Sequence, residues 1–192
     1  MIDLTYDADG TARCGWCSDD PLYRAYHDEE WGREQRGDDA LFELLSLEGF
    51  QAGLSWLTIL RKREGFRQAF AGFSIELVAG FDERDVERLL GDAAIVRHRR
   101  KIEATIGNAG AALQLPGGLS DFVWGFAPPP RSGRPTGMGD LPAATPESTS
   151  LSKELKRRGF GFVGPTTVYA FMQSSGMVDD HLDGCFAAAG SR

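Results

Sequence analysis

The chain has 192 residues, of which 42% are hydrophobic, and this is enough to build one domain around a buried core. No apolar run is long enough to cross a membrane and the acidic N-terminus carries no secretory signal, so we expect a cytoplasmic protein without a membrane partner. Three cysteines cannot make a complete disulfide framework and favour buried thiols or metal ligation. The net charge of −7 argues mildly against a nucleic-acid partner, although basic residues can still cluster on one face.

The N-terminal part divides into two segments of different composition. Residues 1–12 are polar, rich in Asp and Gly and without periodicity, which predicts a flexible N-terminal arm. Residues 13–32 hold two cysteines, two tryptophans, two tyrosines and a histidine, a composition capable of binding metal. The alternative is a core segment in which the aromatic rings and His27 are simply buried.

A carboxylate and an indole flank the next turn of the chain. The leucines of residues 41–45 follow a helical period, which places Glu48 in the last turn, where the helix dipole disfavours negative charge. Trp56 follows eight residues later, across two glycines. The two groups are suited to holding a flat, electron-poor ring. The alternative is a solvated glutamate beside a core tryptophan.

Apolar periodicity in the central part predicts an all-α fold. Asp38 and Asp39 can cap the helix that leads to Glu48. Further helices are predicted to start near Ser55, Ser74, Asp82 and Ser120, and a long helix carries an inward stripe from Ile102 to Leu113. No clear period-two strand pattern occurs in the sequence.

The C-terminal part predicts two helices joined by a glycine-rich hairpin. Residues 127–146 are rich in Pro and Gly and are expected to leave the body of the domain, with helicity resuming near Ser150. After the hairpin 159–164, Pro165 suits the first position of a helix that stops at Gly176. We therefore expect a single domain over residues 13–186 and a frayed tail over residues 187–192.

The hairpin 159–164 is a candidate phosphate site. Successive backbone N–H groups at a helix N-terminus form an anion-binding nest, and Lys156, Arg157 and Arg158 stand beside it. Basic clusters at residues 61–63 and 97–101 suggest a face that follows a nucleic-acid backbone. The alternative is that each basic cluster is only a solvated helix face.

Cysteine and histidine residues near the two ends of the chain are candidate metal ligands. His181 and Cys185 have a spacing that places both side chains on one face of a helical turn. Cys14 can supply a third ligand, and spacing alone does not choose between Cys17 and His27 for the fourth. Four protein ligands leave no open position, so a zinc ion here would be structural. The alternative is buried free thiols with a core histidine.

The order and spacing of these motifs resemble one known family. From Arg13 to Cys185 the chain is similar to the constitutive class I 3-methyladenine DNA glycosylases of the helix-hairpin-helix superfamily. The resemblance is carried by Arg13-Cys14-Gly15-Trp16, Asp20-Pro21-Leu22-Tyr23, Ala25-Tyr26-His27-Asp28, Glu30-Trp31-Gly32, Leu47-Glu48-Gly49, Gln51-Ala52-Gly53-Leu54-Ser55-Trp56, Phe162-Val163-Gly164 and Asp180-His181. The chain departs from the family in its N-terminal extension, at Phe50 and in the Pro/Gly-rich segment.

The resemblance implies a role for each candidate residue. It implies one structural zinc ion held by Cys14, His27, His181 and Cys185, with Cys17 as a bystander. Glu48 is implied as the catalytic residue of a base pocket that also contains Tyr26, Trp56, Trp16, Tyr23 and Trp31. The loop from Gln51 to Leu54 is implied to enter the DNA gap left by a flipped nucleotide. The DNA-contacting residues implied are Gln51, Gly53, Leu54, Gly161, Val163, Gly164, Lys156 and Arg157.

The implied activity is hydrolytic excision of 3-methyladenine from double-stranded DNA, the first step of base excision repair, by a monomer without an obligate protein partner. A lyase variant would carry a lysine just after the hairpin, but the chain has Pro165-Thr166-Thr167 there, which predicts no strand cleavage. Asp180 is interpreted as structural, in the second shell of His181. Two alternatives are a glycosylase for another lesion, suggested by Phe50, and a non-catalytic DNA-binding module joined by zinc.

Overall fold

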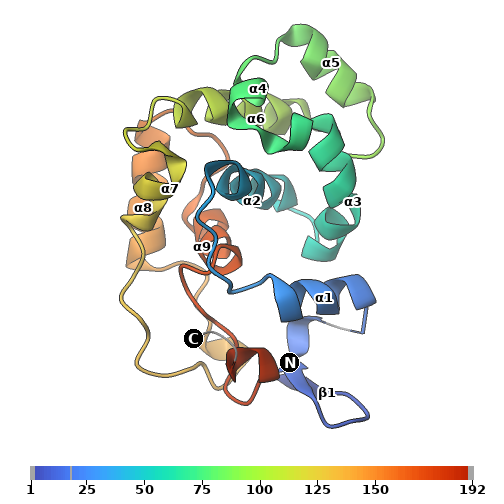
Figure 1. The fold of residues 1–192 in the computed structure, drawn as a ribbon, viewed down its shortest axis with the longest axis vertical. Coiled ribbons are helices and arrows are strands. Elements are labelled where there is room, and N and C mark those ends of the chain that lie inside the picture. Colours follow the sequence, from blue (N-terminus) through green and yellow to red (C-terminus); the bar gives the residue numbers. More distant parts are fainter. Residues whose placement is uncertain (1–2, 18, 190–192) are drawn as a thin grey trace.

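The computed structural model describes residues 3–17 and 19–189, which form a mainly helical fold (Figure 1). The α-helices are α1 (Pro21–Glu29), α2 (Asp38–Gln51), α3 (Trp56–Ala69), α4 (Ile75–Ala79), α5 (Glu83–Gly91), α6 (Arg99–Ala112), α7 (Gly118–Trp124), α8 (Pro146–Arg157) and α9 (Pro165–Ser174). Short 3-10 helices cover Gly15–Cys17, Ala71–Phe73, Met138–Asp140 and Phe186–Ala189. None of the helices in the described ranges has the length and apolar character that a membrane span requires.

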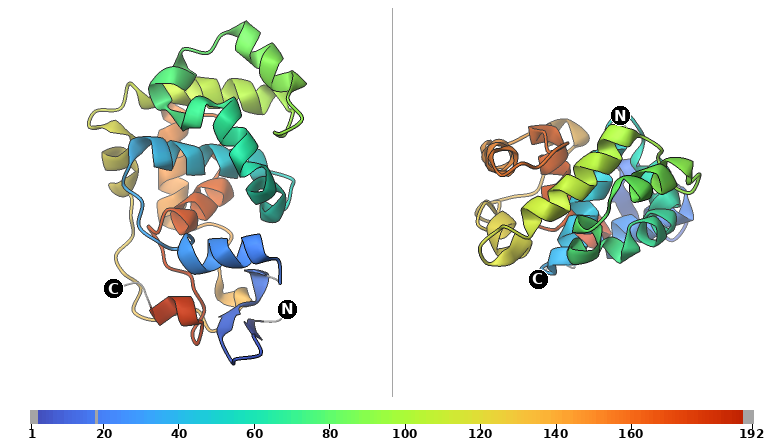
Figure 2. Two further views of the ribbon diagram at one scale, coloured as in Figure 1. Left: turned by 45° about the vertical axis from the view of Figure 1, so that its right-hand side comes forward. Right: turned by 90° about the horizontal axis from the view of Figure 1, so that it is seen from above.

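Helix α2 occupies the centre of the molecule, between α6 and α9 (Figures 1 and 2). It also contacts α3 and α7. Its residues from Leu45 to Phe50 are all buried, so this part of the helix has no solvent-facing side. A charged side chain in that run must therefore lie inside the protein.

The N-terminal segment contains a β-hairpin, so the expectation that the chain has no strands is wrong. Strand β1 (Leu4–Tyr6) pairs antiparallel with β2 (Ala12–Cys14). Three-residue strands are too short to show an alternating pattern in sequence. Tertiary ion pairs support the hairpin, because the guanidinium of Arg13 binds Asp28 of α1 at 2.9 Å and also pairs with Asp7.

Most helix starts agree with the sequence prediction. The Ser55 hydroxyl accepts from the Thr58 N–H at 3.2 Å at the start of α3, and Ser74 and Asp82 cap α4 and α5 in the same way. Two starts lie earlier than predicted. Helix α7 begins at Gly118 rather than at Ser120, and α8 begins at Pro146 behind the cap residue Thr145 rather than near Ser150.

The two aspartates predicted to cap α2 instead hold other helices. The N-cap of α2 is Gly37, and the Asp38 carboxylate accepts from the backbone N–H groups of Leu119 and Ser120 in α7. The Asp39 carboxylate accepts from the N–H of Ile75 at the start of α4, at 2.9 Å. These acidic residues still sit in the first turn of α2, where the helix dipole favours them.

The Pro/Gly-rich segment runs along the body of the molecule and is attached to it by ion pairs. Arg131 binds Asp180 and Arg134 binds Asp179, each with an N···O distance of 2.8 Å. The guanidinium of Arg134 also donates to the carbonyl of Ala188 at 2.6 Å. Thus a segment that cannot form its own core is anchored by charge to the residues that follow α9.

Candidate functional site

Glu48 is buried in the last turn of α2, so the alternative of a solvated glutamate is wrong. Its side chain is 5% exposed. Burial raises the pKa of Glu48 to about 8, and a hydrogen bond with Ser174 at the end of α9 acts in the opposite direction. At neutral pH the carboxyl group is therefore mostly uncharged in the protein as it stands. A buried carboxyl group with so high a pKa is a strong marker of a functional site.

Five aromatic side chains form one connected group of ring contacts. The ring centroids of Tyr26 and Trp56 lie 5.5 Å apart, and those of Trp16 lie 5.1 Å from Tyr23 and 4.8 Å from Trp31. Burial, followed by the charge of Glu48, raises the pKa of Tyr26, which places the two residues close together. We call Glu48 with Trp16, Tyr23, Tyr26, Trp31 and Trp56 the aromatic site.

The indole N–H of Trp56 is buried and has no hydrogen-bond acceptor among the described residues. Buried tryptophans usually find such a partner, so this donor points to a ligand acceptor. Trp56 begins α3 directly after the cap residue Ser55, and Glu48 lies in the last turn of α2. The turn between the two helices therefore brings the donor and the carboxyl group to the same site.

The turn itself is exposed and contains an apolar tip. Gly53 has φ of +86°, a conformation that few other residues adopt, and the Leu54 N–H donates to the Gln51 carbonyl at 2.6 Å. Leu54 is 42% exposed. We call Gln51–Leu54 the insertion loop. Phe50, directly before it, packs in the core with its ring centroid 4.6 Å from that of Phe66, so it does not shape the aromatic site.

The hairpin Gly159–Gly164 presents fewer free donors than the sequence predicted. The N–H groups of Gly159 and Phe160 donate to carbonyls at the end of α8, and the Gly161 N–H donates to the Asn108 side chain at 2.7 Å. The next three N–H groups, of residues 162–164, have no acceptor among the described residues. The possible anion nest is therefore limited to these three. The Val163 side chain is buried, so only its backbone can contact a ligand.

Three arginines of the basic clusters predicted to follow a nucleic-acid backbone are paired with acidic residues of the chain. Ion pairs join Arg61 to Asp20, Arg63 to Glu30, and Arg99 to Glu83, Glu87 and Glu103. Lys101 is buried rather than exposed. Beside the hairpin, Lys156 and Arg157 are exposed, and Arg157 pairs with Glu154 one turn earlier. The sequence overstated the basic surface because most of the pairing carboxylates, those of Asp20, Glu30, Glu83 and Glu87, come from other parts of the chain.

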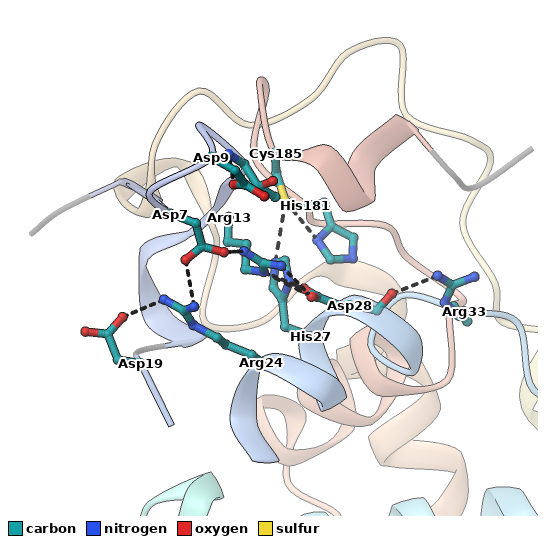
Figure 3. A network of polar contacts seen from close by, with 11 residues as sticks. Asp7, Asp9, Arg13, Asp19, Arg24, His27, Asp28, Arg33, His181 and Cys185 are labelled. Atoms are coloured by element: carbon teal, nitrogen blue, oxygen red, sulfur yellow. Dashed lines mark hydrogen bonds and ion pairs between the residues drawn. The ribbon is translucent and has the colours of Figure 1, made fainter. Parts of the chain in front are cut away.

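A second group of side chains forms a compact cluster near the chain ends. The ligand atoms of Cys14, His27, His181 and Cys185 all lie within 4.8 Å of one another, and all four residues are buried. We call these four residues the metal cluster. Figure 3 shows His27, His181 and Cys185 converging from α1 and the C-terminal segment. Cys17 is also buried but lies outside the cluster, so tertiary structure selects His27 where spacing alone left the choice open.

The dimensions of the metal cluster fit a tetrahedral ion. The Sγ atom of Cys185 lies 3.5 Å from Nε2 of His27 and 3.7 Å from Nδ1 of His181, and the same Nδ1 lies 3.8 Å from Sγ of Cys14. Zinc–sulfur and zinc–nitrogen bonds of about 2.3 and 2.1 Å would place S and N about 3.6 Å apart in a tetrahedron. Hydrogen bonds from Cys14, His181 and His27 lower the pKa of Cys185, which favours the metal-binding thiolate.

Outer contacts orient both histidine rings. The Nδ1 atom of His27 lies 2.7 Å from the Asp28 carboxylate, and Nε2 of His181 lies 3.1 Å from the Trp31 carbonyl. The nitrogen that faces the cluster is thereby fixed in each ring. The sequence prediction missed Asp28, although its position next to His27 was a signal. It assigned the outer contact of His181 to Asp180, which is wrong because the Trp31 carbonyl holds that position. Asp180 instead accepts from Tyr169, Gln173 and Arg131.

A large cleft lies elsewhere, between the Pro/Gly-rich segment and the residues after α9. Its volume is about 1030 Å³, and its lining includes Pro128–Arg134 and Met177–Asp180. Neither Glu48 nor Trp56 lines it. This cleft and the buried Glu48 carboxyl group therefore occupy different places, and the chemistry of the side chains favours the aromatic site.

The helical fold of the chain matches solved structures of known proteins. A solved structure described as 3-methyladenine DNA glycosylase I superposes with a TM-score of 0.87 at 49% identity, covering 91% of this chain and 98% of that one. A second, from Staphylococcus aureus, was described for its recognition of 3-methyladenine and superposes with a TM-score of 0.87 at 39% identity, covering 92% and 96% of the two chains.

Sequence comparison gives the same result. DNA-3-methyladenine glycosylase 1 of Escherichia coli (strain K12) is 50% identical over 184 residues, which cover 94% of this chain and 98% of the relative. The family model described as methyladenine glycosylase matches residues 16–188. The chain belongs to the methyladenine glycosylase family, and the family assignment and the helical fold inferred from sequence are confirmed.

Proposed function

We propose that this protein flips 3-methyladenine out of double-stranded DNA and hydrolyses its N-glycosidic bond. Family membership and the activity for which the close relatives are named support this function. The observation that carries it in this chain is the buried Glu48 carboxyl group beside Tyr26 and Trp56. A dry site with one acidic group and several π faces suits a flat cationic ring better than a neutral one.

The protonation of Glu48 supplies selectivity. The carboxyl group has a pKa of about 8 because it is buried, so it is mostly neutral in an empty site at pH 7. A base that alkylation has made positive attracts the carboxylate form and lowers this pKa, whereas neutral adenine does not. The face of Trp56 adds roughly 0.5–2 kcal/mol for a cation. Its buried indole N–H can donate to a ring nitrogen of the base.

The chemistry then requires little acid catalysis. When the bond between the sugar C1′ and the base N9 breaks, its electron pair cancels the positive charge of the base, which leaves as a neutral molecule. Water adds to C1′ and releases a proton. Glu48 is the catalytic residue in this scheme because it contacts the base and holds it while positive charge moves to the sugar.

DNA binding is assigned to the insertion loop and the hairpin. The exposed Leu54 and its neighbours Gln51 and Gly53 enter the gap left by the flipped nucleotide. The free N–H groups of residues 162–164 bind a backbone phosphate, and the exposed Lys156 and Arg157 add positive charge nearby. Gly161 does not supply a hydrogen-bond donor to the phosphate, since its N–H already donates to Asn108.

One structural zinc ion is assigned to the metal cluster. Its four residues supply two sulfur and two nitrogen ligands at spacings that suit zinc, and four ligands leave no site for water. The ion joins the N-terminal segment to the residues after α9, consistent with one domain over residues 13–186 that acts as a monomer. It supplies stability rather than chemistry.

The decisive experiment is chromatography of the bases that wild-type protein releases from methylated double-stranded DNA. Release of 3-methyladenine without strand cleavage is expected, because Pro165-Thr166-Thr167 offers no lysine after the hairpin. A protein that releases no 3-methyladenine would refute the proposed function. Release of a different base would identify a glycosylase for another lesion.

A further inference from the structure

Lys101 is a buried lysine that holds the backbone on both sides of Gln51. It lies on α6, is 7% exposed, and its Nζ donates to the carbonyls of Phe50 at 2.9 Å and Ala52 at 2.8 Å. Burial lowers the pKa of Lys101, so this placement carries a cost. A lysine is seldom buried without partners. Here the partners are the carbonyls at the C-terminal end of α2, where the insertion loop begins.

Asn108, on the same helix, holds the hairpin. Its Oδ1 accepts from the Gly161 N–H at 2.7 Å and its Nδ2 donates to the Gly161 carbonyl at 3.1 Å. The side chain therefore satisfies both backbone groups of one residue. Lys101 and Asn108 are seven residues apart, two helical turns or roughly 10 Å along the axis, and share one face of α6.

Close packing makes this attachment stiff. A Cβ atom on Gly161 would lie 3.0 Å from the Cβ of Ala104, so the hairpin backbone rests directly on α6. The cavity where α2, α6 and the hairpin meet has a volume of only about 10 Å³, which is space for one water. Neither loop can therefore shift far relative to α6 without opening a void.

Phe162 links the two attachments. It has φ of +55°, a strained conformation for a residue with a side chain, and its ring centroid lies 5.9 Å from Nζ of Lys101. The same ring contacts His98, with centroids 6.3 Å apart. Thus the lysine that holds the insertion loop also lies near the ring of Phe162, the hairpin residue that carries the first of the three free N–H groups.

We propose that α6 sets the distance between the insertion loop and the hairpin, with Lys101 and Asn108 as positioning residues for base flipping. This inference rests on the proposed function. The hairpin holds a phosphate while the loop fills the gap, so both must engage one DNA duplex at a fixed spacing. A displacement of 1 Å in such an arrangement can cost about a hundredfold in rate.

The competing explanation is that Lys101 only stabilises the end of a helix, and Arg88 is a matched control for that role. Its guanidinium donates to the Ala69 carbonyl at the end of α3, at 3.1 Å, and lies 5.3 Å from the Phe81 ring centroid. Lys101 and Arg88 thus both donate to a carbonyl at a helix end and lie near an aromatic ring, but Arg88 is 46% exposed and also pairs with Asp85. Only Lys101 makes such contacts at the insertion loop and hairpin.

The test compares Lys101→Met, Asn108→Ala and Arg88→Met in single-turnover excision of 3-methyladenine from duplex DNA. The affinity for free 3-methyladenine is followed by tryptophan fluorescence, and the melting temperature is measured. Lys101→Met and Asn108→Ala should each slow excision about tenfold to a hundredfold while free-base affinity changes less than about twofold. Arg88→Met, which also removes the ion pair with Asp85, should lower the melting temperature and keep the wild-type excision rate. Lys101→Arg should recover part of the lost rate.

The outcomes separate this inference from the proposed function. Wild-type protein that excises 3-methyladenine, with Lys101→Met and Asn108→Ala equally fast, would overturn the inference alone. An equal loss of excision in Arg88→Met would overturn it too, because stability would then explain the effect. If Lys101→Met fails to fold, Asn108→Ala and Lys101→Arg carry the comparison. Wild-type protein without any excision would refute the proposed function instead.

Discussion

The metal cluster and the aromatic site are both buried and polar, but they differ in how fully their polar groups are satisfied. In the metal cluster, one ring nitrogen of each histidine contacts a group outside the cluster. The four candidate ligand atoms lie within 4.8 Å of one another. In the aromatic site, the Trp56 N–H lacks an acceptor among the described residues and the Glu48 carboxyl group is held neutral by burial. The first arrangement draws all four candidate ligands and the outer partners of both histidines from the protein. The second is complete only with a ligand.

This difference has an energetic meaning. A closed, satisfied cluster stabilises the fold, whereas unsatisfied buried groups cost stability until a ligand compensates them. The carbonyl of Trp31 bonds to His181 while its ring lies against Trp16, so the two regions are adjacent. Substitutions in the metal cluster should therefore change mainly stability. Substitutions in the aromatic site should change mainly activity.

The largest expected effect is loss of the metal cluster. Cys185→Ser should remove a zinc ligand and lower stability on the order of 5 kcal/mol, because binding energy of the ion is folding energy. Elemental analysis and thermal unfolding would measure this. Cys17→Ser is the matched control, since that thiol is buried but outside the cluster, and it should retain the metal. Wild-type protein with far less than one zinc per chain would contradict the assignment.

The aromatic site should show the opposite pattern. Glu48→Gln keeps the size of the side chain but removes its charge, so excision should fall about 10³-fold while folding and zinc content are kept. Rates on methylated DNA and affinity for DNA with an abasic analogue would be compared. A variant that lost DNA affinity and excision in parallel would show that Glu48 serves binding and not chemistry.

The pH dependence of stability sharpens the comparison further. Burial raises the pKa of Glu48 from an ordinary 4.5 to about 8. Between pH 4.5 and pH 8, the folded state therefore holds a proton that the unfolded state has lost. Stability should therefore fall by up to about 1.4 kcal/mol per pH unit across this window and then level off. Urea titrations of wild-type and Glu48→Gln would isolate this contribution. Parallel profiles for the two proteins would argue against a buried neutral carboxyl group.

The smallest expected effect concerns the single indole N–H. Trp56→Phe keeps an aromatic face but removes the buried donor, so affinity for free 3-methyladenine should fall about tenfold, the worth of one hydrogen bond. Stability should change little, because the lost ring contacts are offset by removal of an unsatisfied group. Unchanged affinity in a calorimetric titration would mean that the donor faces away from the ligand.

Local features were predictable because short-range patterns govern them. The caps at Ser55, Ser74 and Asp82, the hairpin after α8 and the start of α9 at Pro165 all follow from neighbouring residues. The position of Glu48 in the last turn of α2 is of the same kind. The short strand β1 was not predicted because three residues are too few to define an alternating period.

Local sequence patterns could not predict the hydrogen bonds and ion pairs between residues that are distant in sequence. Asp38 and Asp39 looked like caps of their own helix but bind α7 and α4, and Arg99 looked like part of a basic surface but is paired with glutamates. Lys101 was grouped with that surface and is buried. These partners are distant in sequence, so the pairing cannot be predicted from local patterns and arises only when the helices pack together.

The sequence by itself determined the family, the helical fold and the residue types of both polar regions, because these are written in motifs, periods and spacings along the chain. Only the tertiary structure decided that His27 rather than Cys17 completes the metal cluster, and that Glu48 is buried and neutral. The physical reason is that ligation distance and desolvation depend on which distant segments surround a side chain. Neither the ligation distance nor the desolvation of a side chain is defined before the core has formed around it.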